Sequence, residues 1–234
     1  KESWPALQAS EDLKAKTSNG QSLTPDAAIL GLHRRLLDVR EQREAAESVR
    51  KQIRAALIKA MEEADQGSPY IRVKAPSKTF DKAGFETAHP KLAKRYTVET
   101  SSVIRRFDPS GLKGHVSDIQ RDNPALFEHL AAVHKSLEAG DPTSVLHSQY
   151  LELLALRGLL DWEHNLLTAG LKTACQQYDE IADVCRWPSR VQIGSRTDTN
   201  SLKREEAEIY KQFLEERDGA REVVNDLGYR FPSG

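Results

Sequence analysis

Apolar side chains recur at alternating three- and four-residue spacings along two long stretches of the chain. This spacing places them on one side of an α-helix and is typical of a coiled-coil seam. The first stretch starts at Thr24-Pro25-Asp26, where Thr24 can cap a helix and Pro25 suits its first position, and it continues to residues 67–69. The second starts after residues 140–143 and ends at Pro188. The pattern predicts two long, coiled-coil-like helices.

Charged and polar residues interrupt both seams near their middle. Arg43 and Arg50 occupy seam positions of the first helix, and Arg157 and His164 occupy seam positions of the second. Either the register of the first helix drifts there, or its middle is partly solvated. For His164 we expect a core or inter-helix hydrogen-bonding role rather than a ligand role.

A short segment with period-two alternation follows each long helix. In residues 70–75 the apolar Ile71 and Val73 alternate with Arg72 and Lys74, and residues 190–193 alternate in the same way. Such alternation predicts β-strands. Residues 96–100 and 103–107 predict one or two further strands, and a short helix is expected from Phe80 to near His89.

Three more helices complete the predicted elements. They cover residues 123–139, 198–216 and 218–227. The predicted fold class is therefore mainly α with small β segments, an α+β protein in which each long helix is followed by short strands.

The order of elements suggests that the chain repeats itself. A shift of 117 residues places Leu36-Leu37 on Leu153-Leu154, Arg40 on Arg157 and Asp81 on Asp198. The Arg-Val pairs at 72 and 190 need one more residue. This indicates a degenerate tandem repeat, with chance similarity between two amphipathic helices as the alternative. The predicted domains are a flexible arm (1–23), a long helix with a basic β segment (24–115), and a second helical module with a short strand and acidic C-terminal helices (116–234).

The overall charge is nearly balanced, but its distribution is uneven. The 234 residues include 34 basic and 35 acidic side chains. Residues 68–115 hold ten basic and four acidic side chains, whereas residues 205–226 hold eight acidic and three basic ones. The basic segment either contacts phosphates or coats a solvated sheet, and the acidic segment either binds a basic partner or pairs with the basic segment.

The nucleic-acid hypothesis can be made specific within the basic segment. Basic side chains that alternate with aromatic ones can neutralise phosphates and stack on bases. The residues predicted for phosphate contact are Lys91, Lys94, Arg95, Arg105 and Arg106, with Tyr96 as the stacking aromatic. The expected ligand is duplex or single-stranded DNA.

Motifs for catalysis and cofactor binding are absent from the sequence. It contains neither a Gly-x-Ser-x-Gly motif nor a phosphate-binding Gly-x-x-x-x-Gly-Lys-Ser/Thr motif. Cys175 and Cys185 are predicted to lie on one helix, about 15 Å apart, where they cannot share a metal or a disulfide unless that helix breaks. We therefore predict no catalytic residue, metal or cofactor, and no enzymatic activity. Stabilisation by a divalent metal would revive the enzyme hypothesis.

Residues 32–107 resemble a known family. An Arg-, Glu- and Ala-rich helical arm is followed by Phe80-Asp81, His89-Pro90-Lys91-Leu92, Tyr96 and residues 101–107. This order is similar to the C-terminal tail of phage recombination exonucleases of the YqaJ type, whose nuclease core is absent here. The plan of helices and strands also resembles Gam-type phage inhibitors of host nucleases, at the level of architecture. The resemblance implies a phage protein of DNA-end metabolism.

Together these observations predict a non-enzymatic phage-type accessory or inhibitor protein. It would act on DNA-end processing or on host DNA-acting machinery, in the cytoplasm of a bacterial or infected cell. The alternative is a protein–protein interaction module that blocks or bridges a host protein without touching nucleic acid. An apolar seam could also form a homo-oligomer. No stretch approaches the ~20 apolar residues of a membrane span, so a membrane association is not expected.

Overall fold

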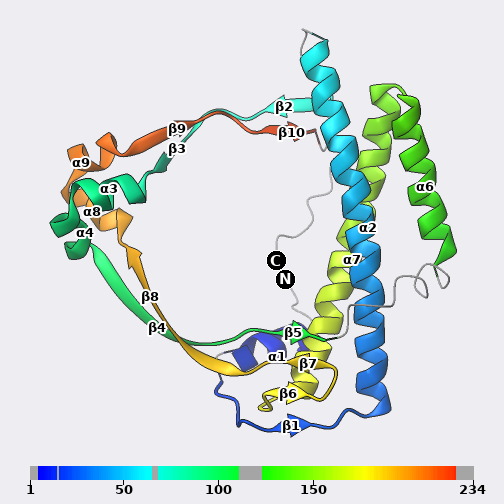
Figure 1. The fold of residues 1–234 in the computed structure, drawn as a ribbon, viewed down its shortest axis with the longest axis horizontal. Helices are drawn as coiled ribbons and strands as arrows, with labels where there is room; N and C mark the ends of the chain where they lie inside the picture. Colours follow the sequence, from blue (N-terminus) through cyan, green and yellow to red (C-terminus); the bar gives the residue numbers. More distant parts are fainter. Residues whose placement is uncertain (1–4, 15, 65–67, 111–122, 225–234) are drawn as a thin grey trace. The chain divides into compact units, whose positions relative to one another are not determined.

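The computed structural model describes residues 5–14, 16–64, 68–110 and 123–224, and it confirms a mainly helical α+β chain with short strands (Figure 1). The chain divides into two compact units. The helical unit comprises residues 1–72, 105–189 and 223–234, and the ribbon unit comprises residues 73–104 and 190–222. Both units combine segments from both halves of the chain, so they do not follow the predicted boundaries. The predicted boundary at 115/116 lies outside the described residues.

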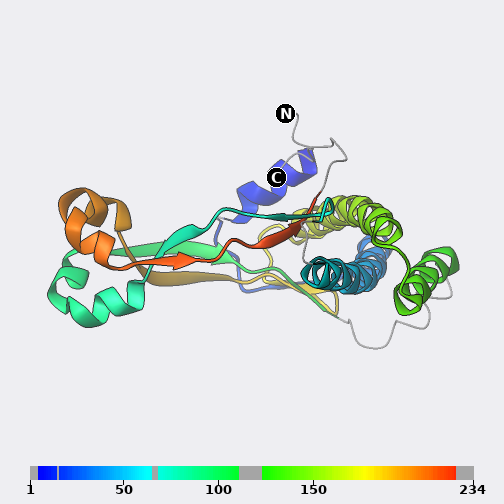
Figure 2. The ribbon, with the colours of Figure 1, turned by 90° about the horizontal axis from the view of Figure 1, so that it is seen from above.

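Two long antiparallel helices form the body of the helical unit. Helices α2 (Ala27–Glu63) and α7 (Thr143–Cys175) lie side by side in both views (Figures 1 and 2). Leu36, near the start of α2, shares a core cluster with Leu171, near the end of α7. At the other end, Leu57 shares a cluster with Leu146. Full burial of each such leucine stabilises the pair by about 1.5–3 kcal/mol. The two predicted seams therefore close on each other within one chain.

The start of α2 differs slightly from the prediction. Asp26, not Thr24, is the N-cap, because its backbone is extended and its side chain accepts a hydrogen bond from the amide of Ile29 (2.8 Å). The helix predicted for residues 123–139 is α6 (Pro124–Ala139), and it packs beside α2.

The end of α7 was predicted wrongly. The helix stops at Cys175, and Gln176 adopts a left-handed backbone with φ of 46°. A short hairpin follows, formed by β6 (Glu180–Ile181) and β7 (Cys185–Arg186). Ile181 and Cys185 are buried in the core beneath the helix end. The heptad pattern continued past the helix because Ile181 and Cys185, four residues apart, are opposite each other in the hairpin and are both buried.

The N-terminal segment is not the predicted flexible arm where the structure describes it. Helix α1 (Pro5–Lys14) packs against α7, and β1 (Ser22–Leu23) runs parallel to β6. Strand β5 (Asp108–Pro109) pairs with β7 at the other edge of this four-stranded sheet. Ser18 is tied to Ser189 by hydrogen bonds of 2.8–2.9 Å.

The predicted repeat is most evident in the ribbon unit. The order β3 (Ser77–Phe80), α3 (Lys82–Ala88), α4 (Pro90–Arg95), β4 (Thr97–Arg105) recurs as β8 (Ser189–Thr197), α8 (Thr199–Glu205), α9 (Ala207–Gln212), β9 (Leu214–Arg217). The 117-residue shift superimposes the bounds of both helix pairs. Asp81 and Asp198 each cap the first helix, accepting a backbone N–H at 3.0 and 3.1 Å. Phe85 and Leu202, four residues later in each repeat, are both fully buried.

The C-terminal elements differ from the two helices predicted there. Residues 198–216 contain two short helices and most of a strand rather than one helix. Residues 218–224 include β10 (Arg221–Val223), which pairs with β2 (Ile71–Val73), and the rest of the predicted 218–227 helix lies outside the described residues. A single helix is excluded because Glu206 has a non-helical backbone (φ −129°, ψ 51°) that ends α8.

Each repeat pairs its strands with those of the other repeat. Strand β3 runs antiparallel to β9, with Ser77 opposite Arg217 and Phe80 opposite Leu214. Strand β4 pairs with β8. At the equivalent points, Asp81 N donates to Phe213 O (2.7 Å) and Asp198 N donates to Tyr96 O (2.8 Å). The crossed pairing makes both units discontinuous in sequence.

Candidate nucleic-acid interface

The structure separates the six predicted contact residues. Lys91 and Lys94 are exposed on α4 and have no acidic partner among the residues that the structure describes. Arg95 is exposed too, but its guanidinium lies 3.9 Å from Glu205 and 3.8 Å from Glu206. Arg106 is exposed and belongs to the helical unit. Lys91 and Lys94 are therefore the two predicted residues of the ribbon unit that are both accessible and unneutralised.

Tyr96 cannot act as the predicted stacking aromatic in this structure. Its side chain is only 5% exposed, because it packs in the core between the helices of the ribbon unit with Phe85 and Leu202. The hydroxyl donates a hydrogen bond to Glu205 Oε2 (3.0 Å). Desolvation, followed by the contact with Glu205, raises the pKa of Tyr96. Its role is structural.

Arg105 also differs from the prediction, because it is buried with 6% of its surface exposed. Its Nε donates to the carbonyl of Trp187 (2.8 Å), and its two terminal nitrogens donate to the carbonyls of Gln176 and Tyr178 (2.5 Å each). The guanidinium also lies over the Trp187 ring, 3.9 Å from its centroid. Burial lowers the pKa of Arg105. These contacts leave the side chain unavailable to a phosphate and make it an anchor between β4 and the end of α7.

Part of the basic segment (residues 68–115) is neutralised by the acidic segment (residues 205–226). This is one of the two alternatives that the charge distribution left open for the acidic segment. Lys74 pairs with Glu222 (2.6 Å), and Arg95 lies beside Glu205 and Glu206. The ribbon unit as a whole holds 13 basic and 11 acidic residues, a difference of +2. The excess over the whole unit is small, so any phosphate-binding surface depends on where the unpaired cations lie.

The β4–β8 ribbon carries two cations, Arg190 and Arg196, that form no ion pair within the described residues and were not among the predicted contact residues. Besides the Asp198–Tyr96 bond, Thr100 Oγ1 donates to the carbonyl of Gly194 (3.3 Å). The step from Tyr96 to Thr100 along β4 matches the step from Asp198 to Gly194 along β8, so the two strands run antiparallel. Residues opposite each other in the two strands therefore share a face. We call one side the arginine face. It presents Arg190, Gln192 and Arg196 of β8 together with Val98, Thr100 and Ser102 of β4.

The other side of the same ribbon carries three exposed aliphatic side chains together with the exposed Glu99 of β4. Val103 lies opposite Val191, and Ile193 follows on the same side, with exposed fractions of 37%, 64% and 78%. We call these three residues the aliphatic face. Neither Arg190 nor Arg196 forms an ion pair within the described part of the chain. The alternation of Arg190 and Gln192 along the predicted strand 190–193 was the signal that could have identified this surface, and the observed strand extends it to Arg196.

The second ribbon differs in its charge. In β3–β9, Lys78 lies opposite Glu216, and Glu215 lies opposite Thr79. The adjoining Lys74–Glu222 ion pair continues this cross-strand pairing. Opposite charges across a ribbon stabilise it and reduce its attraction for an anion. Of the two ribbons, β4–β8 has the clearer excess of positive charge, because β3–β9 carries Glu215 and Glu216 beside its two cations.

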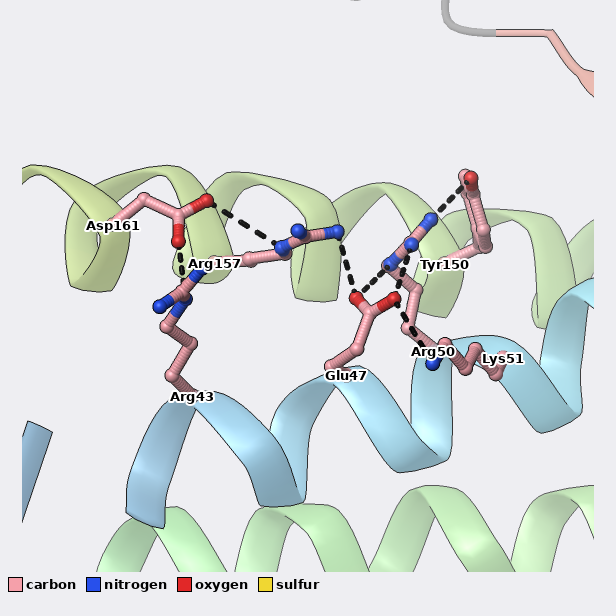
Figure 3. A network of polar contacts seen from close by, with 7 residues as sticks. All are labelled: Arg43, Glu47, Arg50, Lys51, Tyr150, Arg157 and Asp161. Carbon is pink, nitrogen blue, oxygen red and sulfur yellow. Dashed lines mark hydrogen bonds and ion pairs between the residues drawn. The ribbon is translucent and has the colours of Figure 1, made fainter. Parts of the chain in front are cut away.

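The seam arginines of the long helices form a polar network in the helical unit (Figure 3). Glu47 accepts from Arg50 (2.8 Å) and from Arg157 of the facing helix (2.8 Å), and Arg50 donates to the Tyr150 hydroxyl (2.7 Å). Asp161 pairs with Arg157 (3.4 Å) and with Arg43. The hydrogen bond from Arg50 lowers the pKa of Glu47. A polar layer of this kind fixes the register of two packed helices.

The two cysteines, predicted to be about 15 Å apart, are neighbours. Because α7 ends at Cys175, the hairpin folds back and brings Cys185 into the same buried core cluster, while the Cys175 thiol donates to the carbonyl of Tyr178 (3.3 Å). Both thiols are free and buried. The contact with Cys185 and the nearby Arg105 lower the pKa of Cys175, whereas the contact and burial raise that of Cys185.

Within residues 5–14, 16–64, 68–110 and 123–224, no group of three or more His, Cys, Asp or Glu side chains is placed to hold a metal ion. The helices described here include none that combines the length and apolar character needed to cross a bilayer. No family model matches the chain, and no match was found among curated proteins or solved structures.

Proposed function

We propose that this protein is a non-enzymatic DNA-binding accessory protein, whose ribbon unit contacts the phosphate backbone. The resemblance of residues 32–107 to the tail of YqaJ-type exonucleases supports a role in phage DNA-end processing or in control of a host DNA-acting machine. On this proposal the helical unit is a rigid support, and the chemistry is left to a partner enzyme.

The observation that carries the proposal is the uneven pairing of charges in the ribbon unit. Seven of its basic side chains have no acidic partner among the described residues, and most lie on α4, α8 and the β4–β8 ribbon. Its acidic residues are more often engaged, as helix caps or in ion pairs. The seven are Lys78, Lys91, Lys94, Arg190, Arg196, Lys203 and Arg217.

The strength of binding follows from the number of phosphates contacted. Each contact contributes about −0.9 to the slope of log K against log salt concentration on duplex DNA. Four or five contacts would therefore give a slope of roughly −4, in the range of non-specific binders with Kd values of about 10⁻⁴–10⁻⁶ M at physiological salt. Binding should be much tighter at about 50 mM salt than at about 200 mM.

The test is fluorescence anisotropy of labelled duplex and single-stranded DNA at both salt concentrations. The double variant Lys91→Glu/Lys94→Glu should weaken binding and flatten the salt slope by about 2. The matched control is Lys51→Glu/Lys59→Glu, which makes the same charge change on exposed positions of α2 in the helical unit. Absence of binding by the wild type at low salt would refute the proposal, as would an equal effect of both variants.

A second candidate function is protein binding without nucleic acid, and the aliphatic face favours it. The seams of the long helices are closed within the chain, so they no longer offer the groove-binding surface first expected. Exposed Val191 and Ile193 are side chains that a protein partner could cover. With a defined partner, Ile193→Asp should abolish binding while Lys91→Glu/Lys94→Glu leaves it intact. A homo-oligomer and a cytoplasmic location stay predictions.

A further inference from the structure

The β4–β8 ribbon is exposed on both of its faces, which is unusual for a two-stranded ribbon, since such ribbons are normally stabilised by packing on one face. We propose that its arginine face lies in the major groove of duplex DNA. This inference rests on the proposed function and specifies the form of nucleic acid, the groove and the residues.

The dimensions of the ribbon suit this groove. Two paired strands lie about 4.8 Å apart, and the major groove of B-DNA, about 12 Å wide, admits a two-stranded ribbon. Arg190 and Arg196 are six residues apart on β8, which corresponds to about 20 Å along the strand. Base pairs rise by about 3.4 Å, so the two arginines bracket roughly six base pairs.

The side chains on this face match the groups exposed in the groove. An arginine can donate two hydrogen bonds to guanine O6 and N7, and a glutamine can pair with adenine N6 and N7. Gln192 lies between the two arginines, and the hydroxyl of Ser102 projects from the opposite strand. Gly194 has no side chain, and the hydroxyl of Thr100, which donates to its carbonyl, lies 3.4 Å from the place a Cβ would take.

The arginine at position 196 is not required by the fold. The 117-residue shift places Arg196 on Thr79 of the first repeat, and β3 pairs with β9 without an arginine at that position, whereas Arg190 corresponds to Arg72 once one residue is added. The difference at position 196 supports a ligand on the β4–β8 ribbon.

The test compares charge-matched variants on the two ribbons. Arg190→Ala/Arg196→Ala should weaken binding to a duplex of about 20 base pairs by at least tenfold, in anisotropy at about 50 mM salt. The control Lys78→Ala/Arg217→Ala removes two cations from β3–β9, where Glu215 and Glu216 offset them, and should change affinity by less than threefold. Circular dichroism of both variants confirms that each remains folded.

Two further measurements separate groove binding from backbone contact. Duplex RNA of the same sequence has a deep and narrow major groove, so it should bind at least tenfold more weakly than duplex DNA. Selection from a random duplex pool should enrich a short motif, and Gln192→Ala should lose one position of that motif.

The outcomes distinguish this inference from the proposed function. If the wild type binds duplex DNA, but both alanine pairs bind alike and RNA competes equally, the groove assignment is overturned while phosphate contact stands. If the wild type fails to bind any DNA at low salt, the proposed function itself fails. Loss of binding confined to the Arg190/Arg196 pair, with preference for DNA, supports the inference.

Discussion

Replacement of Arg105 by methionine should destabilise the helical unit without a direct effect on DNA binding. The substitution keeps much of the side chain's volume but removes the guanidinium, leaving the carbonyls of Gln176, Tyr178 and Trp187 without its hydrogen bonds. It also removes the cation above the Trp187 ring. The sequence alone had assigned Arg105 to a phosphate, so this variant separates the two interpretations.

The size of the effect can be worked from these contacts. Each hydrogen bond from a charged donor stabilises the fold by about 1.5–3 kcal/mol, but the burial of the charge offsets part of that sum. Breaking such a network costs about 3–5 kcal/mol. For a chain of this length, 1 kcal/mol shifts Tm by about 2–4 °C, so a fall of roughly 10 °C is expected.

The assay is urea denaturation followed by circular dichroism, together with DNA anisotropy well below the new Tm. Arg106→Met serves as the control, since Arg106 is the exposed neighbour and its replacement should change stability by less than about 0.5 kcal/mol. A variant at position 105 that is as stable as the wild type but loses DNA affinity would refute the structural assignment.

Three other predictions concern single contacts. Asp81→Ala and Asp198→Ala each remove an equivalent helix cap, so both should lower Tm by a similar few degrees in a thermal scan, and a clear inequality would contradict the repeat. Because Arg50 lowers the folded-state pKa of Glu47, this stabilisation is complete above the unfolded-state pKa and is lost as pH falls through the folded-state value. Glu47→Gln should therefore flatten the loss of stability measured by denaturation between neutral pH and about pH 3; an unchanged profile would argue against the network. Oxidised glutathione should convert Cys175 and Cys185 to a disulfide and release two molecules of reduced glutathione, which mass spectrometry detects as a loss of two hydrogens from the protein. The variant Cys175→Ser should prevent this reaction. Persistence of both thiols after partial unfolding would count against their proximity.

The sequence pattern predicted the parts of the fold that depend on local periodicity. The long helices, the strand after each of them and the equivalence of Asp81 and Asp198 all follow from spacing and capping. The pairing of β3 with β9 and of β4 with β8 could not be predicted, because register between distant strands depends on contacts that no local pattern encodes.

The candidate site was harder to predict than the fold. Alternation over residues 103–107 indicates a strand, and adjacent Arg105 and Arg106 must then point to opposite faces, but the pattern does not say which faces solvent. The answer depends on Trp187, which is distant in sequence. The exposure of Arg190 and Arg196 could not be predicted for the same reason, since it depends on β4, their distant partner strand.

The crossed pairing of the repeats also constrains when the ribbon unit can form during synthesis. Strand β3 must wait for β9, about 140 residues later in the chain. At about 5–20 residues per second, the first half of the unit exists for roughly 10–30 s before its complement is made. During that interval Phe85 lacks the Leu202 side chain that completes its core. The nascent chain therefore presents an apolar surface that a chaperone can bind, and truncation before β9 should leave an aggregation-prone product rather than a smaller folded protein.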